Sequence, residues 1–228
     1  MKLLKFVPYF GSLYSFLFGK DYGYIGDCKE ITNNILPDKD RYCEENSDGR
    51  VTNLSLYLIN EIEKEKIDKI MSFDTIETLY ISDDSEHSQG LPSNIGNLKN
   101  LKELTIWGIE SFNEKDILNL PISIEKLSLG GAHLTQEDIN GLEKLKNLQF
   151  LSLSDVEEGL DFKSVENLEN LKELDINLYD KEKSTSLYYL KHFKNIETLF
   201  ISKNKLSKKD LENIVLLQNL KELVNMHY

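Results

Sequence analysis

Residues that could carry out chemistry are few in this chain, and the densest group surrounds His87. Asp83, Asp84 and Glu86 precede this histidine, so one short segment holds an imidazole and three carboxylates. These side chains bind divalent metals, but their spacing here fits no standard ligand set. We interpret the segment as a solvated acidic loop and expect no metal site.

Sequence motifs of common enzyme classes are missing. The histidines are spread along the chain, at His87, His133, His192 and His227. No nucleophile elbow, phosphate-binding loop or dinucleotide fingerprint occurs, and the pair Gly130-Gly131 signals only a turn. We therefore expect a protein that is not an enzyme and uses no cofactor.

Side chains suited to binding, in contrast, recur at regular intervals. The large apolar ones are Tyr57, Tyr80, Trp107, Phe150 and Phe200, and the polar ones among them include Thr105, Ser152 and Asp175. Aromatic residues beside serine and threonine are typical of binding surfaces. We expect a ligand site centred on Tyr80 and Trp107, with Tyr57 and Phe150 at its flanks. The alternative is that the aromatic rings only stack on one another and stabilise a sheet.

A repeated phrase indicates which elements position these side chains. It reads LKNLKELTI at residues 98–106, LKNLQFLSL at 145–153, LENLKELDI at 168–176 and FKNIETLFI at 193–201. The central leucine of each copy, fainter copies included, falls at Leu54, Leu79, Leu104, Leu127, Leu151, Leu174, Leu199 and Leu223. These leucines are 23–25 residues apart. A fixed period of this size predicts stacked units that share one apolar core.

Each copy alternates apolar and polar residues, which predicts a short strand with one buried face. The residues on either side of the central leucine, and the residue three positions after it, then point away from the core. The aromatic residues named above occupy these positions. Between the strands, Thr135 before Asp138 and Ser207 before Asp210 predict helix-capping boxes. The segment 90–98, with proline and glycine, predicts a tighter turn-like return.

The phrase L-x-x-L-x-L at this period resembles the leucine-rich repeat family over residues 49–228, in about seven to eight repeats. The resemblance implies an α/β solenoid: a right-handed horseshoe with a parallel sheet on its concave side and mixed helices and turns on its convex side. Residues 90–98 are similar to the plant-type repeat. The aromatic side chains would then line the concave face, where the family usually binds its ligands.

One position departs from the family pattern. Five residues after the central leucine the family usually has asparagine, which forms a ladder of hydrogen bonds between repeats. Here the position holds Ile59, Asp84, Ile109, Ala132, Val156, Tyr179 and Asn204. Only Asn204 matches, so we expect this asparagine ladder to be mostly absent.

The first 19 residues have the parts of a secretory signal peptide. A basic start precedes a 13-residue apolar run from Phe6 to Phe18. The run is too short to span a membrane comfortably, and no other segment approaches that length, so we expect no transmembrane span. The alternative is an apolar arm that docks on the solenoid.

Residues 20–48 resemble the cysteine-bearing N-terminal cap of extracellular leucine-rich repeat proteins. Cys28 and Cys43 lie before the Gly-x-Val-x-x-Leu-x-Leu segment that begins at Gly49. The resemblance implies a disulfide between them, and the alternative is two free thiols in a cytosolic protein. With no histidine near, they do not make a metal site. A single N-glycosylation sequon, at Asn53, would place a glycan on the concave face.

Composition narrows the class of partner. The chain has 228 residues, enough for one domain, with 40% hydrophobic and 29% charged residues and a net charge of −12. An acidic solenoid is a poor candidate for binding nucleic acid or anionic lipid, because phosphate binding needs clustered basic residues. We expect a secreted or cell-surface recognition module that binds a protein, peptide or glycan. The alternatives are a cytoplasmic scaffold or regulatory subunit, and the ectodomain fragment of a receptor-like kinase.

Overall fold

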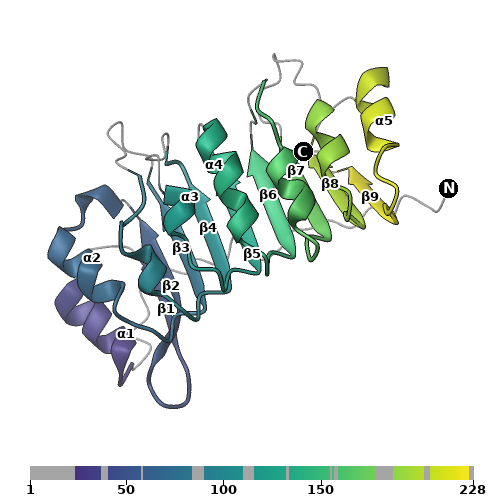
Figure 1. Cartoon of the computed structure of the whole chain (residues 1–228). Helices are drawn as coiled ribbons and strands as arrows, with labels where there is room; N and C mark the ends of the chain where they lie inside the picture. The colour runs from purple at the N-terminus through teal and green to yellow at the C-terminus, as the bar shows by residue number, and fades with distance from the viewer. Residues whose placement is uncertain are drawn as a thin grey trace.

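The computed structural model describes residues 24–36, 41–57, 59–83, 90–109, 116–131, 134–154, 156, 159–177, 187–202 and 206–225. The predicted signal peptide, residues 1–19, and residues 84–89 of the acidic segment around His87 lie outside these ranges. Asp83, the first carboxylate of that segment, is described and is buried, so the expectation of a solvated loop is wrong for this residue. Within them the chain is an elongated array, in which strands run side by side in sequence order (Figure 1).

The strands form one sheet of nine. Their bounds are β1 Arg41–Glu45, β2 Val51–Tyr57, β3 Thr78–Ser82, β4 Glu103–Trp107, β5 Lys126–Gly130, β6 Phe150–Ser154, β7 Glu173–Asn177, β8 Thr198–Ser202 and β9 Glu222–Asn225. β2 to β9 are parallel, whereas β1 pairs with β2 in the antiparallel sense. The parallel strands confirm the predicted solenoid with one open sheet.

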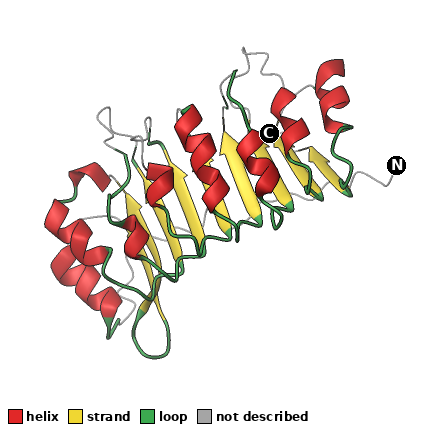
Figure 2. Ribbon diagram, in the orientation of Figure 1, coloured by secondary structure: helices red, strands yellow, loops and turns green. Residues whose placement is uncertain are grey.

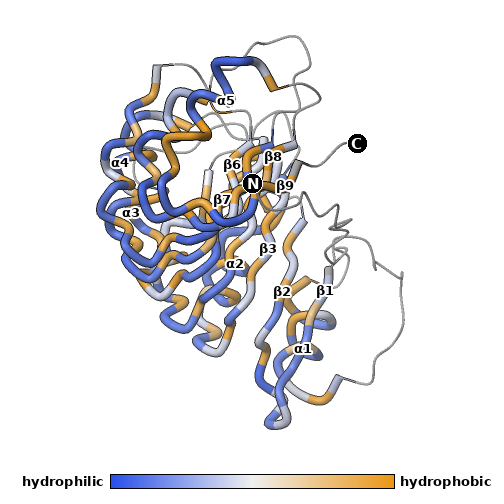
Figure 3. The backbone as a smooth tube through the Cα atoms, turned by 90° about the vertical axis from the view of Figure 1, so that its right-hand side faces the viewer, coloured by the Kyte–Doolittle hydropathy of each residue, from blue (hydrophilic) through white to orange (hydrophobic). Residues whose placement is uncertain are grey.

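Short helices return the chain from each strand to the next. The α-helices are α1 Asp27–Glu30, α2 Lys64–Ile70, α3 Asp116–Asn119, α4 Gln136–Gly141 and α5 Lys208–Ile214. The 3₁₀ turns are η2 Ile59–Glu61, η3 Ile95–Asn97, η4 Leu142–Lys144, η5 Lys163–Asn167 and η6 Tyr188–His192, and η1, Ile31–Ile35, is a π-helical turn. Among the described residues, these returns gather on one face of the sheet, and none of them covers the other face (Figures 2 and 3).

The predicted local signals are confirmed where the structure describes them. Thr135 caps α4, since its side chain accepts from the backbone N–H of Asp138 (3.3 Å) while that carboxylate accepts from the Thr135 N–H (2.8 Å). Ser207 and Asp210 form the same box at α5. The segment 90–98 contains the 3₁₀ turn η3 in place of an α-helix. Helices this short depend on such caps, because few of their backbone groups bond internally.

The central leucines stack in register along the whole array. Leu54 pairs with Leu79, that residue with Leu104, and so on to Leu223. From Leu54 to Leu199 each is at most 1% exposed. The period of 23–25 residues therefore predicted the register of the parallel strands correctly.

Where the structure describes it, the asparagine position of the family is apolar and buried. Ile59, Ile109 and Val156 are at most 4% exposed, so this position adds to the core instead of forming a hydrogen-bond ladder. Asp84, Ala132, Tyr179 and Asn204 lie outside the described residues.

A different side-chain ladder joins the repeats, four residues before each central leucine. Its members are Thr75, Asn100, Ser123, Asn147, Asn170, Asn195 and Asn219, which donate to the carbonyls of Val51, Asp74, Leu101, Ile122, Lys146, Leu168 and Lys194 at 2.7–3.4 Å. Each bond crosses from one repeat to the one before it. We call this set the return ladder.

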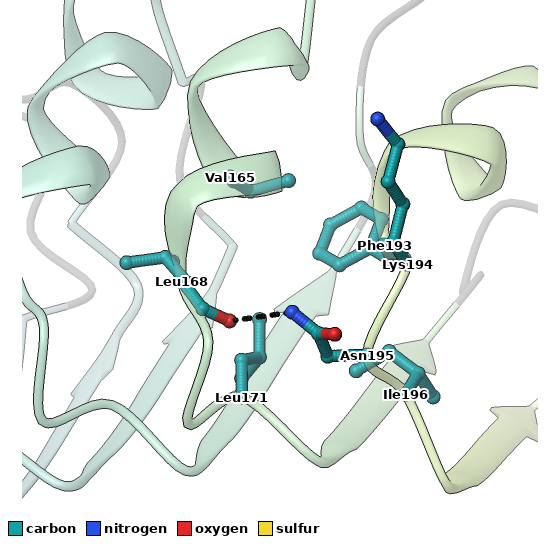
Figure 4. A pocket seen from close by; sticks show the side chains of 7 residues that line it. All are labelled: Val165, Leu168, Leu171, Phe193, Lys194, Asn195 and Ile196. Atoms are coloured by element: carbon teal, nitrogen blue, oxygen red, sulfur yellow. Dashed lines mark hydrogen bonds between the residues drawn. The ribbon is translucent and has the colours of Figure 1, made fainter. Parts of the chain in front are cut away.

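The longest bond of the return ladder runs from Asn195 to Leu168, at 3.4 Å. Figure 4 shows its amide reaching across the shallow gap between the two repeats, beside Phe193 and Val165. The Leu168 carbonyl also accepts from the backbone N–H of Leu171 (3.2 Å), so the Asn195 amide is its second donor.

The amino-terminal cap closes the first repeat. A disulfide joins Cys28 in α1 to Cys43 in β1, and both cysteines are buried. β1 covers the edge of β2 that would otherwise present unpaired backbone groups. Asp27 ties the cap to β2, because its carboxylate accepts from the Val51 N–H (3.0 Å) and from the Arg50 guanidinium (2.9 Å).

Candidate binding face

The face of the sheet opposite the helices, here called the open face, presents three columns of side chains. The first column is Asn53, Thr78, Glu103, Lys126, Phe150, Glu173 and Thr198. The second is Ser55, Tyr80, Thr105, Ser128, Ser152, Asp175 and Phe200. The third is Tyr57, Ser82, Trp107, Gly130, Ser154, Asn177 and Ser202. Apart from Gly130 and Ser154, neighbours in a column are paired across adjacent strands, roughly 4.8 Å apart.

Tyr57, Tyr80, Thr105 and Trp107 lie together on β2, β3 and β4, and we call them the Tyr–Trp cluster. The rings of Tyr57 and Tyr80 are 5.5 Å apart between centroids and tilted by 47°. Thr105 is the register partner of Tyr80, and Trp107 shares the column of Tyr57 with Ser82 between them. The structure thus brings together four of the predicted site residues.

Trp107 is 41% exposed and is the only tryptophan of the chain. Its ring rests on Gly130 of the next strand, where a Cβ would lie 2.1 Å from the indole Cε3. A glycine in a strand often marks a site that another group approaches closely. The alternation of the sequence places Gly130 on this face, but it did not indicate that the ring of Trp107 would rest on it.

Phe150 and Phe200 stand apart from this cluster. Phe150 is in the first column, between Lys126 and Glu173, and β5 separates its strand from that of Trp107. Phe200 is the register partner of Asp175, farther along the sheet. Tyr57 and Phe150 were predicted to flank a site centred on Tyr80 and Trp107. Tyr57 is adjacent to this centre, whereas Phe150 is not.

Asp175 forms hydrogen bonds with one residue on its own strand and one on the preceding strand. Its Oδ2 accepts from the Ser152 hydroxyl (3.1 Å) and from the Asn177 side-chain amide (3.2 Å). Burial raises the pKa of the Asp175 carboxyl above its ordinary value, although the two hydrogen bonds act in the opposite direction. The spacing of the sequence placed Asp175 on this face but did not indicate that its side chain would be partly buried.

Charges along the start of the strands neutralise one another. Lys126 pairs with Glu103 (2.6 Å), and Lys102 pairs with Glu77 (2.9 Å), each across one strand boundary. The carboxylate of Glu77 raises the pKa of Lys102. Such exposed pairs are screened by water and contribute little to stability.

The sequon at Asn53 lies in β2, a strand paired on both sides. The side-chain amide donates to the carboxylate of Glu44 (2.6 Å) and is partly buried. A glycan acceptor is usually an exposed loop residue, so the fold does not favour modification of Asn53.

Two further sequence expectations concern metal and membrane. Among the residues that the structure describes, no group of three or more metal-binding side chains comes together. In the same part of the chain, none of the helices has the length and apolar character needed to cross a bilayer.

No protein-family model matches the sequence, and no curated protein matches it. Solved structures do. An internalin C2 from Listeria monocytogenes, a leucine-rich repeat protein, is 23% identical to this chain and aligns with a TM-score of 0.50, over 79% of this chain and 74% of the other. The likeness shows the fold, that of a leucine-rich repeat solenoid.

Proposed function

We propose that this chain is a non-enzymatic recognition module that binds a protein or peptide on its open face, chiefly through the Tyr–Trp cluster. The observation that carries the proposal is Trp107, a large exposed ring held in place by Gly130 beside Tyr57 and Tyr80. Tyrosine and tryptophan give much contact area for little loss of side-chain entropy. A group already fixed in place loses less freedom on binding.

The architecture supports the same proposal. Solenoids use their extended sheet surface for binding, and here the helical returns of the described residues cover the opposite face. We further propose that the sheet curves as a right-handed horseshoe with the open face on its concave side. A glycan is the alternative ligand, since aromatic rings also stack on sugars.

We also propose the domain order and location. Residues 1–19 act as a signal peptide, residues 20–48 as the cap and residues 49–228 as the repeat array. The disulfide between Cys28 and Cys43 supports an extracellular site, because such bonds persist in oxidising compartments. Secretion from a eukaryotic host followed by intact-mass measurement tests this: the mature protein is expected to lack the leader and keep the cysteines linked. A retained leader with two free thiols would favour the cytoplasmic scaffold.

Peptide selection tests the binding function directly. A phage-displayed peptide library is panned on the purified chain, and selected peptides are titrated while the fluorescence of Trp107, the sole tryptophan, is followed. Calorimetry then compares the variants Tyr80→Ala and Trp107→Ala, which are expected to bind roughly tenfold or more weakly. Val215→Ser is the matched control, because Val215 is 79% exposed at the end of α5 on the helical side. Peptides that bind all of these proteins equally would contradict the proposal.

A further inference from the structure

On β7 and β8 of the open face, two buried polar atoms have no hydrogen-bond partner within the described part of the chain, Oδ1 of Asp175 and Oγ of Ser202. Asp175 lies in β7 and Ser202 in β8, and the register pairs Asp175 with Phe200 and Asn177 with Ser202. The two atoms therefore belong to diagonal neighbours on adjacent strands, with Phe200 next to both.

Unpaired buried polar atoms are uncommon, because each has lost water without gaining a partner. Two such atoms on neighbouring strands of one face are acceptors that the donors of a ligand could satisfy. The other carboxylate oxygen of Asp175 is already bonded by Ser152 and Asn177. Asp175 takes part in none of the ion pairs that the described residues form with one another. The carboxylate is thus held in place through Oδ2, while Oδ1 is shielded from solvent and accepts no hydrogen bond from the described residues.

The chemistry of these groups specifies a cation with several donors. A carboxylate oxygen and a hydroxyl oxygen both accept hydrogen bonds, and an aromatic ring attracts a flat cation over its face. The guanidinium of arginine is planar, always charged and carries five N–H donors in a fixed fork, whereas an ammonium group is a compact point charge. The net charge of −12 favours a cationic partner as well.

We infer that Asp175, Ser202 and Phe200 form a site for an arginine side chain of the partner whose binding is proposed above. The guanidinium donates to Asp175 Oδ1 and to Ser202 Oγ and stacks on Phe200. The inference rests on the proposed function of the open face and adds the chemical class of one contact.

The position of this site predicts a spacing in the ligand. Asp175 is three strands from Trp107, roughly 14 Å at the usual strand separation. An extended peptide that crosses the strands covers this distance in about four residues. Peptides selected on the chain are therefore expected to place an arginine about four residues from an apolar or aromatic one.

A minimal probe tests the arginine site without a known partner. The peptide acetyl-Gly-Arg-Gly-amide, its lysine counterpart and its neutral citrulline counterpart are titrated into the full chain, with the ¹³C signals of aspartate carboxyls and phenylalanine rings followed by NMR. The arginine peptide is expected to shift the Asp175 and Phe200 signals in a saturable way, the lysine peptide to bind more weakly and the citrulline peptide not to bind. Equal binding of the citrulline peptide, or no saturable shift, would overturn the inference.

Three variants localise the effect. Asp175→Asn keeps the shape of the side chain and is expected to weaken binding of the arginine peptide roughly tenfold or more. Ser202→Ala is expected to reduce the preference for arginine over lysine. Glu173→Gln removes the same charge from an exposed residue of the same strand and face, so binding should stay within about twofold. An equal loss in Asp175→Asn and Glu173→Gln would assign the effect to the general acidic field and overturn the site.

The failure of this inference and the failure of the proposed function can be told apart. Selected peptides that depend on Trp107 but not on Asp175 would leave the proposed function intact and remove the arginine site. Selected peptides that ignore Trp107 would remove the proposed function, while the titration with the arginine peptide still decides this site on its own.

Discussion

The indole of Trp107 lies so close to Gly130 that a Cβ at position 130 would come within 2.1 Å of its Cε3. The two residues are register partners in β4 and β5. The absence of a side chain on one strand therefore determines the orientation of the only tryptophan, on the neighbouring strand.

The variant Gly130→Ala tests this relationship. The added methyl group is expected to push the indole away from β5, and the ring has room to move because it is 41% exposed. Fluorescence emission should shift to longer wavelength as the ring becomes more hydrated. The free energy of unfolding in urea should change by no more than about 1–2 kcal/mol, since alanine favours a strand while the displaced ring loses contacts.

Ser128→Ala is the matched control for this prediction. Ser128 lies on the same strand and face but pairs with Thr105 instead of Trp107. Its emission spectrum should equal that of the unsubstituted chain. An unchanged spectrum in Gly130→Ala as well would show that the glycine does not position the ring.

The return ladder predicts a stability effect of single asparagine substitutions. Asn147→Ala removes the bond to the Ile122 carbonyl (3.0 Å) and is expected to cost about 0.5–1.5 kcal/mol, the usual net contribution of one hydrogen bond. Asn147→Asp is expected to cost more at neutral pH, because a carboxylate cannot donate and repels the carbonyl. Urea unfolding followed by circular dichroism measures both changes.

Asn97→Ala separates the ladder from a general loss of asparagine. Asn97 is exposed in η3, and its side chain forms no hydrogen bond with the residues that the structure describes. Its substitution should change the free energy of unfolding by less than about 0.5 kcal/mol. If Asn97→Ala costs as much as Asn147→Ala, the ladder bonds do not stabilise the stack.

Loss of the disulfide is expected to weaken the cap. Cys28 and Cys43 enclose a sequence separation of 15 residues, and removing a crosslink of that size costs about 3 kcal/mol in the chain-entropy estimate. The double variant Cys28→Ser, Cys43→Ser should therefore unfold at lower urea concentration than the oxidised chain. Addition of a reductant should lower the midpoint of the oxidised chain and leave that of the double variant unchanged. A reductant-independent midpoint in both would contradict a stabilising bond.

Much of the fold was predictable because it depends on local periodicity. Apolar residues every second position give strands, and their recurrence every 23–25 residues gives the register, so Leu54 to Leu223 could be aligned from the sequence. The capping boxes at Thr135 and Ser207 were predictable for the same reason, since both partners lie within one turn.

The return ladder was not predictable in this way. Asn147 belongs to the repeated phrase, but its acceptor is a backbone carbonyl 25 residues earlier, which no residue type marks. The family pattern suggested a different asparagine, at a position that Ile109 and Val156 fill with core side chains. The bond therefore depends on how adjacent returns stack, which only the folded chain shows.

The candidate site was predictable in part. Alternation placed Tyr80, Trp107 and Asp175 on one face, and the register then put Tyr80 beside Tyr57. The distance between two side chains of the face also depends on which column each occupies. Phe150 is in the first column and Trp107 in the third, on strands that β5 separates, so the two lie apart. The unpaired oxygen of Asp175 depends on burial, which the alternation of residues does not specify.

The raised pKa of Asp175 predicts a stability difference that depends on pH. The folded chain holds this proton more tightly than the unfolded chain, whose carboxyl titrates near its ordinary value of 3.8. Stability that the protonated group contributes is therefore lost as pH rises from about 3.8 through the folded pKa. Above the folded pKa the wild-type chain bears the full cost of a buried charge, and Asp175→Asn, which has no charge, does not.

The variant Asp175→Asn should accordingly be more stable than the wild-type chain at neutral pH, and its advantage should shrink as pH falls toward 3.8. Other carboxyls, such as Glu166 with its lowered pKa, destabilise both proteins in acid and cancel in the difference. Urea unfolding at a series of pH values measures the difference in free energy of unfolding between Asp175→Asn and the wild-type chain, with Glu173→Gln as the control for net charge. A difference that does not vary with pH would show that Asp175 is not the origin. A stabilised variant that no longer binds the arginine peptide would show a residue retained for recognition at a cost in stability.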